Sequence, residues 1–181
     1  MDKTCKTELH RSFLIEGLPE PLTRASSHLQ IFDNYITNTR IRLRSVRNPD
    51  TREWKRILQQ KIAVSRFADM YLNDEEYAQF HIFEGTEIRK NRYFHEYGGK
   101  TFSLDVYLGS LWGLNMAKIE FENADEMRDF EPPSFLIAEV TNDQFFAGES
   151  LVLKTFSEVE VEVLKMGVAY DGSVGEVRPY M

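Results

Sequence analysis

Hydrophobic and polar residues alternate with a period of two along most of the chain, which is the pattern of half-buried β-strands. Turn-forming residues interrupt the alternation, among them Asn48-Pro49-Asp50 and Gly98-Gly99. The strands predicted in this way cover residues 8–15, 29–36, 40–44, 54–64, 86–97, 100–108 and 114–122. Because short turns join most successive strands, we expect an antiparallel sheet of seven or eight strands.

Two or three short helices should accompany this sheet. Asn73 and Asn123 are each followed by acidic residues, which is typical of a helix start. Residues 159–163 alternate again, and the Gly-rich end that follows them has no clear assignment. The predicted helices cover residues 73–83, 123–131 and 142–156. The whole chain, residues 1–181, is therefore predicted to be one α+β domain whose antiparallel sheet curls or closes.

Composition and charge narrow the class of protein. A chain of 181 residues with 42% hydrophobic positions can bury a real core, and no apolar run reaches the length of a membrane span. The N-terminus lacks the apolar stretch of a signal peptide, and the single Cys5 cannot form an internal disulfide, so we expect a cytoplasmic protein. The net charge of -7 argues against nucleic-acid polymers and acidic membranes as partners.

Like charges nevertheless gather on single strand faces, because side chains two residues apart point the same way. The basic rows are Arg40, Arg42 and Arg44 on one strand and Lys90 and Arg92 on another, with Lys61 on a third. Such rows repel unless a multivalent anion lies over them, and guanidinium groups suit phosphate oxygens. The alternative is an ordinary solvated face, which any one of these strands could present.

Acidic residues occupy further strand faces. Glu8 shares its face with His10 and Ser12, while Lys118 shares one with Glu120. Carboxylates close to bound phosphates would hold a divalent ion such as Mg²⁺. A phosphate-rich ligand and a metal are therefore the candidate chemistry.

These stretches, taken in order, resemble the CYTH domain, also called the triphosphate tunnel metalloenzyme family. The resemblance covers residues 7–151 and rests on six stretches: 8–15, Arg40-Ile41-Arg42-Leu43-Arg44, Ile88-Arg89-Lys90-Asn91-Arg92, Leu104-Asp105-Val106-Tyr107, 113–121 and Glu139-Val140-Thr141. Members of the family include inorganic triphosphatases, thiamine triphosphatases and class IV adenylate cyclases. The resemblance implies an eight-stranded antiparallel tunnel with a charged interior and short flanking helices.

The resemblance also implies roles for individual residues. The expected ligand is a triphosphate or polyphosphate molecule, and the expected cofactor is Mg²⁺ or Mn²⁺. The phosphate-binding set is Arg40, Arg42, Arg44, Lys61, Lys90 and Arg92. The metal-binding set is Glu8, His10, Asp105, Glu120 and Glu139. Catalysis would involve Glu8, Glu120 and Lys61.

Two departures from the family pattern leave the activity open. The expected Glu-x-Glu-x-Lys reads Glu8-Leu9-His10-Arg11-Ser12, and a second Glu-x-Glu reads Lys118-Ile119-Glu120. The chain is then either a metal-dependent triphosphatase or cyclase-like enzyme, or an inactive module that binds a nucleotide or polyphosphate. Lys118 either supplies a replacement positive charge or repels the metal, and the missing carboxylate at His10 favours repulsion.

Overall fold

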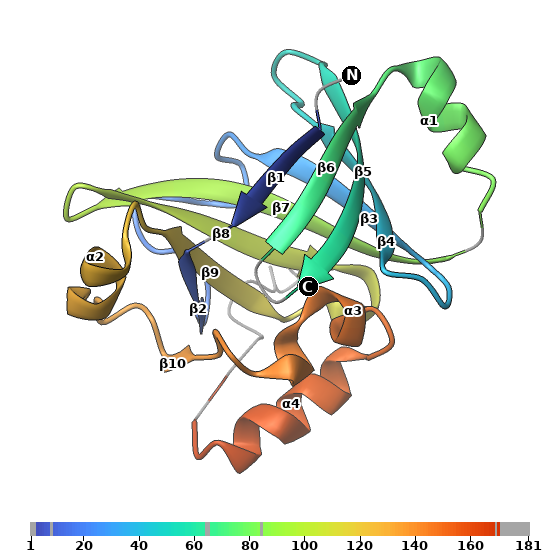
Figure 1. The fold of residues 1–181 in the computed structure, drawn as a ribbon. Helices are drawn as coiled ribbons and strands as arrows, with labels where there is room; N and C mark the ends of the chain where they lie inside the picture. The colour runs from blue at the N-terminus through green and yellow to red at the C-terminus, as the bar shows by residue number, and fades with distance from the viewer. Residues whose placement is uncertain (1–2, 8, 64–65, 84, 169, 171–181) are drawn as a thin grey trace, which may run out of the picture.

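A computed structural model describes residues 3–7, 9–63, 66–83, 85–168 and 170. Its dominant element is one antiparallel sheet of ten strands (Figure 1). The strands are β1 Lys3–Thr7, β2 His10–Leu14, β3 Leu29–Ile36, β4 Ile41–Arg47, β5 Trp54–Ala63, β6 Arg66–Leu72, β7 Gly85–Tyr97, β8 Lys100–Leu108, β9 Asn115–Glu120 and β10 Ala138–Glu139.

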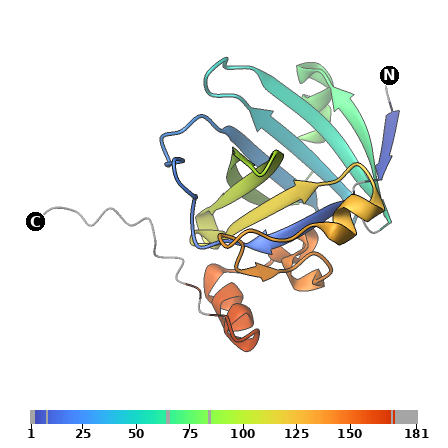
Figure 2. The same ribbon diagram turned by 90° about the vertical axis from the view of Figure 1, so that its left-hand side faces the viewer.

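The sheet curls into a nearly closed tunnel. Its strand order is β1-β6-β5-β4-β3-β7-β8-β9-β2-β10. β1 and β2 follow one another in the chain, yet β1 pairs with β6 near one edge and β2 pairs with β9 near the other. Figure 2 shows the strong curvature that brings these edges together. With β1 and β2 counted as one interrupted strand and the two-residue β10 left aside, eight strands surround the tunnel, which confirms the predicted fold class.

Each of the seven predicted strands has a counterpart in the described part of the chain. β3 and β8 have the predicted bounds, and the β7–β8 hairpin turns at Gly98 and Gly99, whose φ angles are +58° and +74°. That left-handed region admits glycine without strain. β6 was not predicted. It pairs with both β1 and β5, so neighbouring strands rather than its own sequence establish it.

The first two predicted helices are confirmed, and the third needs correction. α1, Asp74–Phe80, begins at a capping box of Asn73 and Glu76, and α2, Ala124–Asp129, is capped by Asn123. In place of one helix over residues 142–156 there are two short ones, the 3₁₀ helix η2, Gln144–Phe146, and α3, Gly148–Leu151. A further helix, α4, Phe156–Lys165, begins where the predicted helix ends. The alternating residues 159–163 belong to α4. Val159 and Val163 lie one turn apart on the same face of this helix, and both are buried.

Two hydrophobic cores support the sheet. One joins inward residues such as Leu14 and Met116 to Leu151 and Val159 of the C-terminal helices, which lie together beneath one end of the sheet (Figure 1). The other packs the outer face of β2, β8 and β9 against α2 and the segment after it. A short 3₁₀ helix, η1 Gly109–Leu111, joins β8 to β9. No helix in the described part of the chain is long and apolar enough to cross a membrane.

Candidate anion-binding site

A cavity of about 240 Å³ lies inside the curled sheet and gathers charge from five strands. Its cationic lining residues are Arg42, Arg44, Lys90, Arg92 and Lys118, and its carboxylates are Asp33, Asp105 and Glu120. The five cations exceed the three carboxylates by two, although the whole chain carries a net charge of -7. The interior is therefore a locally positive site in an acidic protein, which is the distribution that an anion needs.

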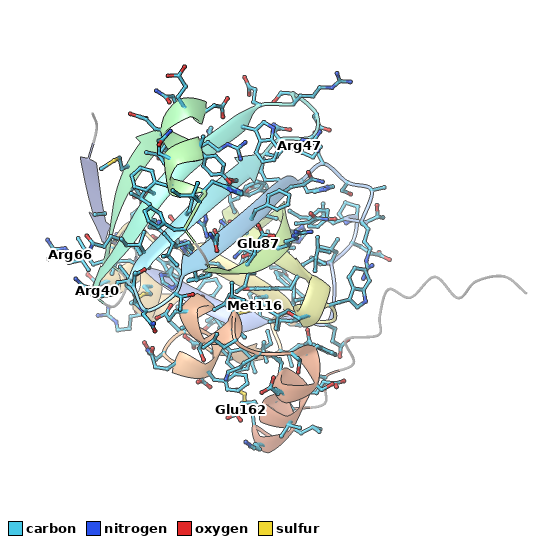
Figure 3. The ribbon with its side chains drawn as sticks, turned by 90° about the vertical axis from the view of Figure 1, so that its right-hand side faces the viewer. Arg40, Arg47, Arg66, Glu87, Met116 and Glu162 are labelled. Carbon is cyan, nitrogen blue, oxygen red and sulfur yellow. The ribbon has the colours of Figure 1, made fainter. Side chains whose placement is uncertain are left out.

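A second cavity, of about 310 Å³, adjoins the first and has exposed residues such as Arg40 and Glu149 in its lining. The two share the lining residues His10, Tyr35, Arg42, Gln59, Phe67 and Gly148. The second also reaches Arg40 and Lys61. Arg40 immediately precedes β4, at the end of the strand opposite Arg47 (Figure 3). Together the cavities form one passage, with a highly charged interior and a more mixed vestibule.

Asp33 of β3 organises the basic row on β4. Arg44 donates two hydrogen bonds to it, from Nε at 2.6 Å and from Nη2 at 2.7 Å, and Arg42 lies 3.4 Å away. Burial by itself would raise the pKa of the Asp33 carboxyl, but Arg42 and Arg44 outweigh burial and hold that pKa well below its usual range. Asp33 therefore stays ionised and fixes the direction of both guanidinium groups.

Arg42 is held from two further sides. It donates to the Tyr35 hydroxyl at 2.9 Å and to the Gln59 side-chain oxygen, and Gln59 in turn donates to Asp69 of β6 at 2.7 Å. The register explains this chain of contacts, since Tyr35 pairs with Arg42, Arg42 with Gln59, and Gln59 with Asp69. A guanidinium with this many partners is oriented before any ligand arrives.

Asp105 of β8 plays the same part for the basic row on β7. Lys90 donates to it at 2.6 Å, and Arg92 donates from Nε at 2.6 Å and from Nη2 at 2.8 Å. Burial would raise the pKa of Asp105, yet Arg92 and Lys90 lower it far below its usual range. Burial also lowers the pKa of Lys90 from 10.5 to about 8, against the opposing attraction of Asp105.

These contacts correct one premise drawn from the sequence. The basic rows do have counter-charges within the protein, namely Asp33 and Asp105, so their presence alone does not demand a bound anion. The case for an anion rests instead on the excess of positive charge in the cavity. A guanidinium also has five N–H donors, and Arg44 uses only two on Asp33.

The residues predicted to hold phosphate all lie along the passage. Arg42, Arg44, Lys90 and Arg92 line the inner cavity, while Arg40 and Lys61 line the vestibule. Lys61 forms an ion pair with Glu149 of α3 across the vestibule. The sequence reasoning therefore selected the cationic side chains that the fold brings together.

The residues predicted to hold a metal are dispersed. Glu139 forms an ion pair with Arg11 at 2.6 Å and lines neither cavity, and Asp105 is engaged by Lys90 and Arg92. Glu8 lies outside the described residues. His10 and Glu120 pair across β2 and β9 and both line the inner cavity. Three of the five predicted ligands, His10, Asp105 and Glu120, thus line the inner cavity, but Asp105 is already bound by two cations of the protein.

The described residues do not fit a metal centre. Among them, no group of three His, Cys, Asp or Glu side chains could hold a metal ion. The donor set explains why: the oxygens of Asp33 and Asp105 accept from arginines, and Glu120 lies 3.1 Å from the ammonium of Lys118. A divalent ion prefers unshared carboxylate oxygens.

Three lining residues, and Asp69 as the partner of the lining residue Gln59, were missed from the sequence. Asp33 and Tyr35 lie in a correctly predicted strand, and its alternation already placed them on one face with Ile31. An acid at a position otherwise apolar was the available signal. Asp69 was missed because β6 was not assigned, and Glu149 because contact between α3 and Lys61 depends on the fold of the C-terminal segment.

Comparisons with known proteins show a similarity to inorganic triphosphatases in sequence and in fold. No family model matches the chain. The chain is 27% identical over 152 residues to an inorganic triphosphatase of Nitrosomonas europaea, covering 81% of this chain and 97% of that protein. A crystal structure of an inorganic triphosphatase aligns with a TM-score of 0.59 and 24% identity over 81% of this chain and 98% of its own. A second, described as that of a hypothetical protein, aligns with the same TM-score and 25% identity over 82% and 99%. In sequence and in fold, the chain resembles the triphosphate tunnel metalloenzymes, as its strand motifs predicted.

Proposed function

We propose that the tunnel binds inorganic triphosphate or a longer polyphosphate. The observation that carries this proposal is the convergence of Arg42, Arg44, Lys90, Arg92 and Lys118 on one cavity of about 240 Å³. The similarity to an inorganic triphosphatase supports the same class of ligand.

The arrangement favours an anion with several phosphate groups over a single one. The basic rows lie on β4 and β7, which are separated by β3 in the sheet, so a short anion cannot contact both rows as fully as a longer one. Asp33 and Asp105 hold the rows in place before binding, which lowers the side-chain entropy that the protein loses when a ligand binds. Affinity should therefore increase with the number of linked phosphates.

Calorimetry on one inward and one outward arginine of β4 tests the proposal. Arg42→Ala should weaken tripolyphosphate binding by about tenfold or more, as expected for one charge-assisted contact. Arg47→Ala is the matched control, because Arg47 lies on the same strand but lines neither cavity, and it should bind like the wild type. Equal affinities for the wild type and Arg42→Ala would contradict a tunnel site.

Hydrolysis of the bound anion is the second candidate function, and the similarity to an inorganic triphosphatase favours it. Glu120 and Lys61 remain the predicted catalytic residues within the described passage, and Glu8 remains a third outside the described residues. The requirement for Mg²⁺ or Mn²⁺ also stays a prediction. Phosphate release from tripolyphosphate, measured with each metal and after metal removal, separates an enzyme from a binding module.

A further inference from the structure

Lys118 faces the arginines of β4 across the inner cavity. In the order β4-β3-β7-β8-β9, β9 lies four strands from β4, which is half-way round a tunnel of eight strands. Lys118 of β9 and Arg42 and Arg44 of β4 all line the same cavity. An anion lying between them would therefore meet positive charge from two opposite walls.

Every carboxylate that lines the inner cavity in the described part of the chain is paired with a cation of the protein, and Lys118 is the partner of one of them. Its ammonium lies 3.1 Å from the Glu120 carboxylate, two residues along the same strand face. Arg44 engages Asp33, and Arg92 engages Asp105. Each acidic side chain among the described lining residues thus already contacts a cation of the protein itself.

We infer that the Lys118 ammonium supplies positive charge that a divalent cation would otherwise supply, so that the tunnel binds tripolyphosphate without a metal. The inference rests on the proposed polyphosphate site and specifies how that site is neutralised. A metal approaching Glu120 would meet the Lys118 charge at close range, and in a partly buried site that repulsion is strong. The same ammonium, on a long and flexible side chain, can reach a phosphate oxygen from the wall facing the arginines.

The primary experiment is calorimetric titration of the metal-stripped full chain with sodium tripolyphosphate, repeated with Mg²⁺ present. We expect the metal-free protein to bind, with an affinity within about fivefold of that measured with Mg²⁺. Lys118→Met should lower metal-free affinity by at least about tenfold, and Lys118→Arg should retain most of it. Lys118→Glu should instead create a carboxylate pair with Glu120, and Mn²⁺ binding measured by electron paramagnetic resonance should appear.

The matched control is Lys165→Glu, which makes the same charge change at a surface lysine paired with Glu162 at 2.8 Å. It should leave both affinities unchanged, and thermal melts of all variants check folding. Binding of tripolyphosphate by the wild type only when metal is present would overturn the inference while leaving the polyphosphate site intact. Metal-free binding that Lys118→Met leaves unchanged would overturn it equally. Failure of the wild type to bind under either condition would refute the proposed function itself.

Discussion

Asp33 shows how a single buried acid sets the character of this site. Its side chain is almost fully buried and forms a two-point contact with Arg44. A buried ion pair contributes little net stability, but removal of one partner leaves the other charge uncompensated in a low-dielectric interior. The main effect of Asp33 is therefore to orient Arg42 and Arg44, and its net contribution to stability is small.

Asp33→Asn should destabilise the free protein by about 3 kcal/mol, because Arg44 loses its buried counter-charge. Saturating tripolyphosphate should then stabilise this variant by more than it stabilises the wild type, because the ligand replaces the missing negative charge. Urea unfolding with and without ligand measures both quantities. Asp74→Asn is the control, since Asp74 pairs with Arg56 in an exposed position. Unchanged stability of Asp33→Asn would show that the buried charge of Arg44 does not depend on Asp33.

Lys90 makes anion binding sensitive to pH. Because its pKa is lowered to about 8, the ammonium loses its proton as the pH rises through 8, and tripolyphosphate affinity should fall. Lys90→Arg should flatten that fall. The ligand titrates identically with both proteins, so calorimetry at pH 7 and pH 9, with the two proteins compared, isolates the lysine. If affinity fell equally with pH in the wild type and Lys90→Arg, Lys90 would not be the cause of the fall.

The same residue affects folding stability in the opposite direction. The unfolded chain holds the Lys90 proton up to its ordinary pKa of 10.5, whereas the folded chain releases it near 8. Between these values the unfolded state binds more protons, so the contribution of Lys90 to the free energy of unfolding rises with pH. Between pH 8 and pH 10.5, tripolyphosphate affinity should therefore fall while the contribution of Lys90 to the free energy of unfolding rises.

Sequence reasoning found the cations of the site because alternation within one strand places them on one face. It did not find their acidic partners, because the pairing of Asp33 with Arg44 and of Arg92 with Asp105 depends on cross-strand register. Register follows from strand order, and the order β4-β3-β7-β8 is not contained in any single strand. The position of Glu139 also depends on strand pairing. On β10 its side chain contacts Arg11 and lines neither cavity.

Among the elements, the C-terminal helices were the hardest to predict. The Val159-to-Val163 segment alternates like a strand, yet its first and last valines are also spaced for one helix face, and a capping box of Thr155 and Glu158 starts the helix. Contact with the sheet decides between the two, because both buried valines join the core beneath it. Strands bounded by clear turns, such as β7 and β8, were predictable because their own residues specify both ends.

α3 brings an acid to the vestibule, and that acid should compete with the ligand. Glu149 pairs with Lys61, and its side chain is about half exposed. Glu149→Gln should release Lys61 and strengthen tripolyphosphate binding by about fivefold, while stability changes by less than about 1 kcal/mol, as for other exposed pairs. Glu162→Gln on α4 is the control, because Glu162 pairs with Lys165 away from both cavities. Weaker binding by Glu149→Gln would instead make this carboxylate part of the binding site.

For the whole molecule, the ligand should act as a stabiliser of the folded state. Tripolyphosphate at a hundredfold excess over its Kd should add about 2.7 kcal/mol to the free energy of unfolding. For a chain of this size that corresponds to a rise in Tm of roughly 5–10 °C. Orthophosphate at the same concentration and ionic strength should raise Tm much less. Small, equal shifts for the two anions would argue against a site built for linked phosphates.

The N-terminal run that joins the two sides of the sheet has a consequence for folding kinetics. β1 pairs with β6, about sixty residues away in the chain, and β2 pairs with β9, more than a hundred residues away. Non-local pairings of this kind give a high contact order and slow folding. During synthesis, β2 must wait for residues 115–120 to leave the ribosome before its partner exists. The tunnel is therefore assembled late, and β2, which is made early, is among the last strands to be paired.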